Sequence, residues 1–369
     1  MKTKAAVLRG LNRPFEIEEL NLDPPKAGEV LIKYVAAGLC HSDEHLRNGD
    51  LVPRFPIVGG HEGSGIIEEV GEGVTRLKPG DHVICTFLPV CGTCRFCVAG
   101  MTNLCDTGAG AVNGTMLDGT FRLHSDSGED LGGFCMLGTF SERGVISQSS
   151  CVKVADDVPL DKAALIGCGV PTGFGSAVHA AETQPGDTIA IYGVGGIGIN
   201  AVQGAALAGA TNVVAIDPLA NKREMAERLG ATHSCATAER AQALIQELTR
   251  GVGADKAIVT VGVVDTEVTT NAFHAIRKGG TVVVTGLADP TKNTIEIPGA
   301  LLTLFEKRIQ GSLFGSGDPF TDIPRLVDMY QAGQLKLDEL ITNTYRIDDV
   351  NKGYEDLING VNVRGVILF

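Results

Sequence analysis

The sequence predicts an α/β protein made of two parts, a β-rich N-terminal part and a doubly wound parallel sheet. β-Branched runs bounded by glycine or proline recur before residue 169, for example at 29–35, 64–70 and 82–85. From about residue 170, short apolar runs alternate with helical segments, as in parallel βα units. Because 369 residues exceed the usual size of one hydrophobic core, two domains are expected.

The first part opens with a strand. Residues 1–9 carry basic side chains, but their apolar run is too short for a signal peptide, so we expect the opening strand of a cytoplasmic protein. Pro79-Gly80-Asp81 marks a turn before the strand at 82–85. The chain shows no internal repeat and no low-complexity linker.

The second part alternates strands and helices. Strands are expected at 189–192, 212–216, 255–261 and 281–285. Helices are expected at 201–210, at 221–229 and 238–250 (closed by Gly230 and Gly251), and between residue 261 and Gly279-Gly280. A helix near 322–331 and a strand at 363–369 complete the chain.

A glycine-rich turn joins the first strand of this second part to its helix. It reads Gly193-Val-Gly195-Gly196-Ile197-Gly198. Gly193 permits a tight bend, Gly195 lets the backbone approach a pyrophosphate, and Gly198 lets helix and strand pack closely. The phosphates would lie at the positive end of the helix. The pattern predicts a dinucleotide site, and the alternative is an ordinary glycine-rich βα turn.

Asp217 ends the second strand, nineteen residues past Gly198. A carboxylate at this position accepts hydrogen bonds from the ribose hydroxyls of adenosine. It would also repel a 2′-phosphate, so NAD is favoured over NADP.

Composition excludes several classes of partner. The formal charge of −13 argues against nucleic acid or an anionic membrane, and no apolar run reaches membrane-spanning length. The 44% hydrophobic and 20% charged residues are ordinary for a globular protein. Ten cysteines in a chain of this size with no export signal favour metal binding or free thiols over disulfides.

Four cysteines cluster within fifteen positions, at Cys91, Cys94, Cys97 and Cys105. Four thiolates can close a tetrahedral shell around a structural zinc ion. An iron–sulfur cluster takes the same ligands, but no electron path is evident in the β-rich part, which favours zinc. Unpaired or disulfide-bonded cysteines are the remaining alternative.

A second, dispersed set joins Cys40, His61 and Cys168, each in a glycine-containing loop. Two thiolates and one imidazole would leave the fourth position of a zinc ion open for substrate. The residue types alone do not show that these three side chains meet, and each is equally compatible with a core cysteine or a hydrogen-bonded histidine.

The chain resembles the zinc-dependent medium-chain alcohol dehydrogenases from end to end. The resemblance is carried by the motifs at 38–43, 60–65, 91–105, 167–169, 172–176 and 193–198. It implies a GroES-like catalytic domain at 1–169 with a zinc lobe near 88–108, a Rossmann NAD-binding domain at 170–311, and a return segment at 312–369 that completes the catalytic domain.

The resemblance assigns two zinc ions per chain. Residues matching Cys40, His61 and Cys168 hold the catalytic ion in that family. Those matching Cys91, Cys94, Cys97 and Cys105 hold the structural ion.

It also assigns the residues around the catalytic ion. Ser42 matches the hydroxyl that passes on the alcohol proton, and His45 matches the histidine that delivers this proton to solvent. Glu62 and Asp43 match acids behind the metal, with Asp43 orienting the ligating imidazole. Leu51 and Phe87 match residues of the alcohol pocket.

The cofactor residues implied by the family are His41, Thr172, Gly193, Gly195, Gly196, Ile197, Gly198, Asp217, Lys222 and Arg364. Thr172 matches a position against the nicotinamide, Lys222 one beside the adenosine ribose, and His41 and Arg364 positions that face the pyrophosphate. Arginine is common where this chain has His41, so the charge there would depend more on pH. Ordinary surface roles are the alternative for His41, His45 and Lys222.

The resemblance therefore implies reversible oxidation of primary or secondary alcohols with NAD. A thiol-adduct formaldehyde dehydrogenase is one alternative, although relatives with that activity tend to carry an acid where this chain has Leu51. An actinobacterial type that holds NAD tightly, and uses an external acceptor or acts as an aldehyde dismutase, is another. A non-catalytic NAD-binding protein or redox sensor is the alternative from a different class.

A homodimer is expected. Residues 309–314 could form an edge strand that pairs across a two-fold axis. The long segment 113–138 is typical of dimeric relatives, or could be a solvated Ω-loop. The physiological alcohol and the preferred direction of reaction are not encoded in any motif.

Overall fold

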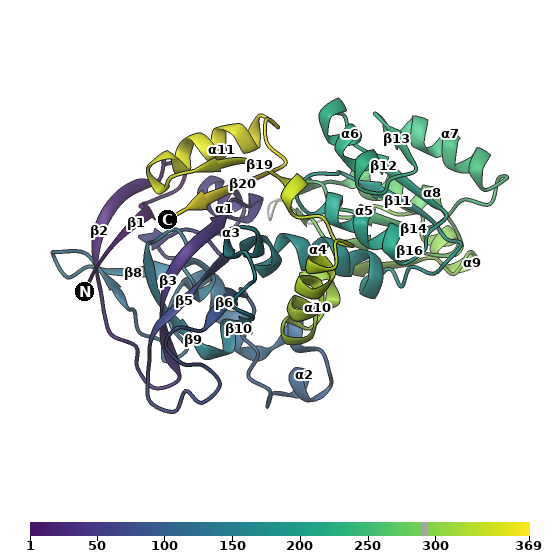
Figure 1. Ribbon diagram of the computed structural model, residues 1–369. Coiled ribbons are helices and arrows are strands. Elements are labelled where there is room, and N and C mark those ends of the chain that lie inside the picture. The colour runs from purple at the N-terminus through teal and green to yellow at the C-terminus, as the bar shows by residue number, and fades with distance from the viewer. Residues whose placement is uncertain (289–293) are drawn as a thin grey trace. The chain divides into compact units, whose positions relative to one another are not determined.

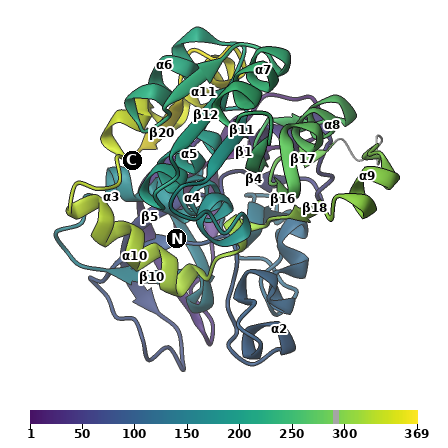
Figure 2. The ribbon, with the colours of Figure 1, turned by 90° about the vertical axis from the view of Figure 1, so that its right-hand side faces the viewer.

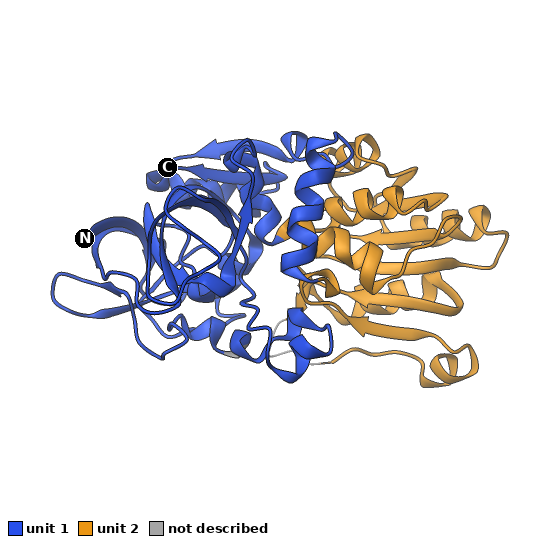
Figure 3. Cartoon of the chain, turned by 60° about the horizontal axis from the view of Figure 1, so that its bottom comes forward, with its two compact units in different colours: residues 1–168, 318–369 blue, residues 169–317 orange. Residues whose placement is uncertain are grey.

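The computed structural model describes residues 1–288 and 294–369 (Figure 1). The chain forms two compact units: unit 1 is residues 1–168 and 318–369, and unit 2 is residues 169–317 (Figure 3). Residues 289–293 of the expected NAD-binding domain lie outside the described residues. Both boundaries differ from the expected ones, by one residue at the first, because Gly169 belongs to unit 2, and by six at the second, because residues 312–317 belong to unit 2. The Ser312 amide there donates to the carbonyl of Val284, 2.9 Å away.

Unit 1 contains a closed barrel of short strands in the order β1-β2-β7-β8-β4. The bounds are β1 Lys2–Leu8, β2 Glu16–Leu22, β4 Ile57–Val58, β7 Leu123–His124 and β8 Asp130–Gly133. Alternate apolar side chains of these strands point inward, as expected for a strand with one buried face. They form a core of Ala5, Val7, Leu20, Leu22, Val58 and Leu131 with their neighbours.

The β7–β8 hairpin corrects one of the two interpretations of segment 113–138. This segment is not a solvated Ω-loop, because β7 pairs with β2, and β8 pairs with both β7 and β4. The apolar side chains of Leu123 and Leu131 lie in the barrel core.

A seven-stranded sheet in the order β10-β6-β5-β3-β20-β19, with β9 pairing β3, makes up the rest of the β structure of unit 1. The bounds are β3 Glu29–Gly38, β5 Gly63–Val70, β6 His82–Cys85, β9 Arg143–Ser147, β10 Cys151–Val154, β19 Ile341–Tyr345 and β20 Arg364–Leu368. The pairing of β20 with β3 is antiparallel. The C-terminal strand β20 therefore joins the sheet of the first unit.

The helices of unit 1 are α1 His41–Asn48, α2 Arg95–Val98, α3 Leu160–Ala163, α10 Pro319–Gln331 and α11 Val350–Ile358. α10 begins where the sequence favours a start, since Asp318 caps the amide of Phe320 and proline occupies the first helical position. α1 begins directly after Cys40 and ends at Gly49, whose φ of 96° suits glycine. No described helix combines the length and apolar character needed to span a lipid bilayer.

Unit 2 is a six-stranded parallel sheet in the order β13-β12-β11-β14-β16-β18 (Figure 2). Its strands are β11 Thr188–Tyr192, β12 Asn212–Ile216, β13 His233–Cys235, β14 Ala254–Val259, β16 Ile276–Val284 and β18 Arg308–Gly311. Its helices are α4 Gly169–Gly175, α5 Gly198–Leu207, α6 Ala220–Arg228, α7 Ala238–Leu248, α8 Thr266–Ala275 and α9 Gly299–Leu304. β15 Val263–Val264 and β17 Leu287–Ala288 form a small separate pair. The predicted doubly wound sheet is confirmed.

The expected helix before β16 ends earlier than predicted. α8 stops at Ala275, and the two glycines proposed to end it, Gly279 and Gly280, lie inside β16. The register shifts there, so that Ala254 faces Ile276 but Lys256 faces Thr281. The glycines therefore form part of a bulge in the strand rather than a helix terminus.

Candidate metal and active site

Four buried side chains of unit 1 converge on one point. One ligand atom each from Cys40, His61, Glu62 and Cys168 lies within 4.8 Å of the other three. Cys40 stands just before α1, His61 and Glu62 just before β5, and Cys168 at the end of unit 1's first segment. The structure thus brings together the three dispersed residues that sequence alone could not join.

Glycines let these loops approach one another. Gly60 has a φ of 88°, and a Cβ there would lie 2.6 Å from the backbone nitrogen of Phe140. A Cβ on Gly167 would lie 2.4 Å from the carbonyl oxygen of Cys85. A side chain at either position would push a ligand-bearing loop away from the cluster.

Asp43 fixes the imidazole of His61 from behind. Its Oδ2 lies 2.9 Å from Nδ1 of His61, and its Oδ1 accepts a hydrogen bond of 2.6 Å from the amide of Gly60. Both side chains are buried. Nε2 of His61 makes no hydrogen bond within the described part of the chain. A carboxylate on one ring nitrogen and an unsatisfied second nitrogen is the usual arrangement of a metal-ligating histidine.

The charge distribution also fits a cation. A hydrogen bond from the Cys168 thiol holds the pKa of Cys40 well below its usual range, against the effect of burial, and His61 lowers it further. Burial disfavours charge on His61, but Asp43 and Cys40 raise the pKa of the imidazole well above its ordinary value. A thiolate and an imidazole with an orphaned nitrogen, both buried, form a donor set that a zinc ion would satisfy.

Glu62 pairs with Arg364, and both side chains are buried. Burial raises the pKa of Glu62 to about 7, while Arg364 pulls it down. Arg364 also donates to the carbonyl of Leu39 at 3.3 Å. Sequence resemblance placed this arginine toward a pyrophosphate; the structure places its guanidinium against the acid of the metal cluster.

Ser42 and His45 occupy one face of α1, three residues apart. The Ser42 hydroxyl lies 3.8 Å from the sulfur of Cys40. Nδ1 of His45 lies 2.6 Å from Oδ2 of Asp50, just beyond the end of α1. His41, the first residue of α1, is exposed.

Aromatic and apolar side chains border the cluster. The rings of Phe87 and Phe134 meet the His61 imidazole edge-on, with centroids 5.8 and 5.3 Å away. Phe87 and Leu51, both expected in the alcohol pocket, are partly buried and pack against the same core cluster as Phe134. An apolar wall therefore stands beside the metal ligands.

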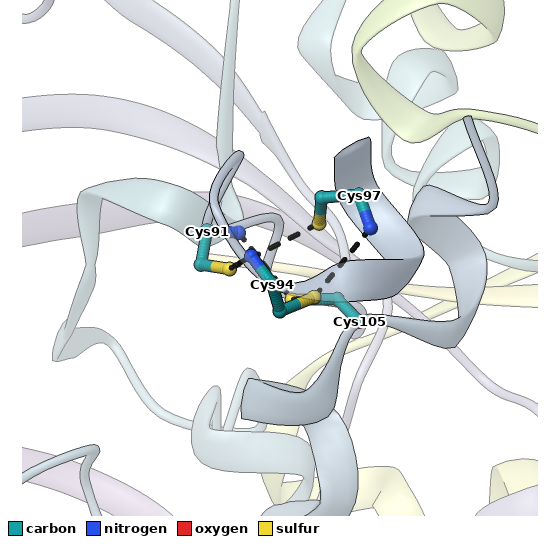
Figure 4. A group of neighbouring side chains, drawn as sticks. All are labelled: Cys91, Cys94, Cys97 and Cys105. Carbon is teal, nitrogen blue, oxygen red and sulfur yellow. Dashed lines mark hydrogen bonds between the residues drawn. The ribbon is translucent and has the colours of Figure 1, made fainter. Parts of the chain in front are cut away.

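The four-cysteine group forms a compact set in unit 1 (Figure 4). Sulfurs of Cys91 and Cys97 are 3.9 Å apart, as are those of Cys94 and Cys105. Ligands around one zinc ion with bonds of about 2.3 Å would be about 3.8 Å apart. Because an iron–sulfur cluster divides its cysteines among several irons, this spacing favours a single ion.

Backbone amides donate hydrogen bonds to the cysteine sulfurs and so stabilise their thiolate form. The amides of Thr93 and Cys94 donate to the sulfur of Cys91, at 3.4 and 3.3 Å, and lower its pKa to about 6. The amide of Cys97 donates to Cys94 at 3.5 Å. These hydrogen bonds favour thiolates, the form that binds metal.

The glycine-rich turn of unit 2 has the geometry its sequence predicts. Gly193 has a φ of 86°, and a Cβ there would lie 2.9 Å from the backbone of Val261. A Cβ on Gly198 would lie 1.9 Å from the Gly193 carbonyl oxygen. Around Gly195 the nearest atom to such a Cβ is the Lys222 amine, 3.9 Å away. The turn is thus tight at its two ends and open at its centre, as a phosphate cradle requires.

The other cofactor candidates of unit 2 surround this turn. Asp217 accepts hydrogen bonds from the amides of Val194 and Leu219, at 3.0 and 2.9 Å. Ile197 directly precedes α5, and the Gly196 carbonyl accepts from Asn200 at 2.9 Å. Thr172 lies in α4, buried, with a hydroxyl that has no partner among the described residues.

Sequence reasoning missed Phe134, which meets the His61 ring, and two further residues of the site, Tyr354 and Asp50. Tyr354 of α11 is buried and its hydroxyl donates to the Cys40 carbonyl at 3.4 Å. No local pattern connects residues so far apart in the chain. The sequence could have indicated Asp50, because Gly49 marks the end of a helix. The chain folds back at such a glycine and brings the next residue close to the last helical turn.

Two family models and several known proteins match this chain. Residues 26–156 match the family described as alcohol dehydrogenase GroES-like domain, and residues 196–332 match zinc-binding dehydrogenase. The chain is 62% identical over 368 residues to an NDMA-dependent alcohol dehydrogenase from Amycolatopsis methanolica, covering 100% of this chain and 99% of the relative.

Two solved structures are similar over 100% of this chain and 99% of their own, each at 31% identity. One is an alcohol dehydrogenase zinc-binding domain protein from Burkholderia ambifaria, with a TM-score of 0.94. The other is benzyl alcohol dehydrogenase from Acinetobacter calcoaceticus, with a TM-score of 0.93. The chain belongs to the zinc-dependent medium-chain alcohol dehydrogenases and is an oxidoreductase of that family.

Proposed function

We propose that this protein oxidises alcohols with NAD and holds two zinc ions per chain. Cys40, His61 and Cys168 would hold the catalytic ion, and the four cysteines from Cys91 to Cys105 the structural one. The observation that carries the proposal is the buried convergence of the first three ligands, backed by Asp43 on the imidazole. Zinc would supply Lewis acidity toward the substrate oxygen, and NAD would accept the hydride.

Residues of unit 1 would bind the alcohol and accept the proton that its hydroxyl group loses. The apolar side chains of Phe87 and Leu51 would contact the alcohol and select it by its size, which gives loose substrate selectivity. The Ser42 hydroxyl would take the alcohol proton and pass it toward His45 on the same face of α1. Glu62 would keep its position through the buried pair with Arg364.

Residues of unit 2 would bind NAD. The open centre of the glycine turn offers its amides to the pyrophosphate, at the N-terminus of α5. When NAD binds, Asp217 would give up part of its hydrogen bonding to backbone amides and would accept hydrogen bonds from the ribose hydroxyls of adenosine instead. Its charge would repel the 2′-phosphate of NADP.

A second candidate concerns the electron acceptor. The 62% identity to an NDMA-dependent alcohol dehydrogenase over the full length favours turnover that depends on NDMA rather than on exchange of free NAD. In that case NAD would remain bound through successive cycles. The leucine at position 51, rather than an acid, disfavours the thiol-adduct formaldehyde dehydrogenase.

The chain would act as a homodimer in the cytoplasm. β18 is the last strand of the six-stranded sheet, and its outer edge could pair with a second copy. The metal-binding thiols require a reducing compartment. Light scattering on the purified protein measures the assembly state, and a monomeric mass would reject the dimer.

The proposal is tested by metal analysis and turnover of the purified protein with benzyl alcohol. We expect two zinc ions per chain, and turnover with added NAD, NDMA or both. Cys40→Ser should abolish turnover and remove one zinc ion while the fold persists. Cys235→Ser, which changes a half-buried thiol outside both clusters, is the matched control. Full activity of Cys40→Ser would reject the ligand assignment, and absence of zinc would favour a non-catalytic NAD-binding protein.

A further inference from the structure

The end of α1 holds a carboxylate against the histidine of the proton path. Asp50 Oδ2 lies 2.6 Å from Nδ1 of His45. The local backbone creates this contact, because the His45 carbonyl accepts hydrogen bonds from the amides of both Gly49 and Leu51, at 3.2 and 2.9 Å. Gly49 adopts a left-handed φ of 96° that lets the chain fold back over the helix end. The Asp50 side chain is thereby directed at the imidazole.

The two side chains differ in their access to solvent. The His45 side chain is 5% exposed and that of Asp50 is 20% exposed. The ring is therefore enclosed by protein, whereas the carboxylate reaches water. A proton that arrives on this imidazole has a nearby acceptor that is better connected to solvent than the ring itself.

The short contact also fixes which ring nitrogen carries hydrogen. An ionised carboxylate can only accept, so in the neutral ring Nδ1 carries the hydrogen and Nε2 is the proton acceptor. Ser42, the proposed source of the proton, lies three residues earlier on the same face of α1.

We infer that Asp50 is a positioning residue of the alcohol dehydrogenase reaction, which sets the tautomer of His45 and receives the proton that this histidine releases. The inference rests on the proposed role of Ser42 and His45. One proton binds to Nε2 of His45, the proton on Nδ1 moves to Oδ2 of Asp50, and the carboxyl group then releases it to water. No electrons are exchanged in these steps. The dyad returns to its first state when Asp50 passes a proton from water to Nδ1 and Nε2 releases its own proton to water, so that each cycle delivers one proton to solvent.

The kinetic test measures nicotinamide reduction in a single turnover of the nucleotide-loaded enzyme with benzyl alcohol. Asp50→Asn keeps the shape and a hydrogen-bond acceptor but cannot take a proton. We expect it to slow the step by about 10- to 100-fold, by analogy with losing the carboxylate partner of a metal-ligating histidine. Increasing phosphate buffer should restore the rate, because phosphate replaces the lost acceptor. Asn48→Ala is the matched control, since Asn48 accepts from the Asp50 amide at 3.1 Å but offers no carboxylate.

The structural test does not depend on turnover. Nitrogen-15 NMR of histidine-labelled protein distinguishes the two tautomers, and His45→Gln assigns the signal. The wild-type and Asn48→Ala proteins should show hydrogen on Nδ1. Asp50→Ala should shift His45 toward hydrogen on Nε2.

The outcomes separate this inference from the proposed function. A wild-type rate for Asp50→Asn at low buffer concentration, or a deficit that phosphate does not relieve, overturns the proton-acceptor role. An unchanged tautomer in Asp50→Ala overturns the positioning role. If His45→Gln itself retains the full rate, the proposed proton path is wrong, whatever Asp50 does.

Discussion

Asp43 shows how one fully buried carboxylate organises two loops of the site. One oxygen holds the His61 ring and the other holds the Gly60 amide. In Asp43→Asn, the side-chain NH2 group would face either the His61 ring or the Gly60 amide, so one of these two contacts must be lost. We expect activity to fall by about 10- to 100-fold and zinc to fall toward one ion per chain. Asp126→Asn, an exposed acid that pairs with Lys2, is the control.

Zinc content and turnover measured on the same samples check this prediction. A variant that keeps two zinc ions and full turnover would show that Asp43 serves only the Gly60 loop.

Gly38 is a second residue on which the site depends. A Cβ there would lie 2.0 Å from a Glu62 carboxylate oxygen and 3.1 Å from Arg364 Nη2. Gly38→Ala should therefore displace the buried pair and lower the free energy of unfolding by about 1–3 kcal/mol, the usual cost of overpacking. Urea denaturation measures it. In the control Gly299→Ala, a Cβ meets no atom of the described residues within 4 Å, so stability should be unchanged or slightly higher.

At the scale of elements, the four-cysteine segment lacks a core of its own. α2 has only four residues, none of them buried. A helix this short is not stable by itself, so we infer that a metal ion and the amide–sulfur hydrogen bonds hold the segment together. Its order should therefore depend on the metal.

Limited proteolysis tests this dependence. Cys97→Ser, or treatment with a chelator, should make the exposed Arg95 in α2 a new trypsin cleavage site. Cys235→Ser, in unit 2, should leave the digestion pattern unchanged. Equal resistance of Cys97→Ser and the wild-type protein would mean that packing, rather than metal, orders this segment.

The elements differ in how well the sequence predicted them. The parallel strand at Asn212–Ile216 agrees with its prediction, because a continuous apolar run between turn residues is a strong local signal. The hairpin of β7 and β8 was not predicted, since its short strands depend on pairing with β2 and β4, which are distant in the chain. The end of α8 was misplaced because glycines mark bulges as well as helix ends.

The site shows the same division between local and distant signals. The ligands at Cys40, His61 and Cys168 lie in glycine-rich motifs, which the family resemblance could identify. The contact of Arg364 with Glu62 joins residues 302 positions apart, and no periodic pattern in the sequence indicates that they meet. Only folded coordinates show such a pair.

At the scale of the whole molecule, the two units differ in how the chain builds them. Unit 2 is one continuous segment, 169–317, with its own parallel sheet and a core between that sheet and its helices. Unit 1 needs two segments, because β20 from the C-terminal end pairs with β3. Removal of residues 318–369 would leave the backbone of β3 at 36–38 unpaired on that side, and would remove Arg364 from Glu62.

This difference predicts opposite behaviour of two fragments. Residues 169–317 alone should fold, unfold cooperatively on heating and bind NAD, because the glycine turn and Asp217 both lie within them. NADP should bind more weakly, since Asp217 would repel its 2′-phosphate. Residues 1–168 alone should not give a cooperative transition. Circular dichroism measures folding and calorimetry measures binding. A folded 169–317 fragment that binds NAD and NADP equally would remove Asp217 from cofactor selection, and a stable 1–168 fragment would show that β20 is dispensable for the first unit.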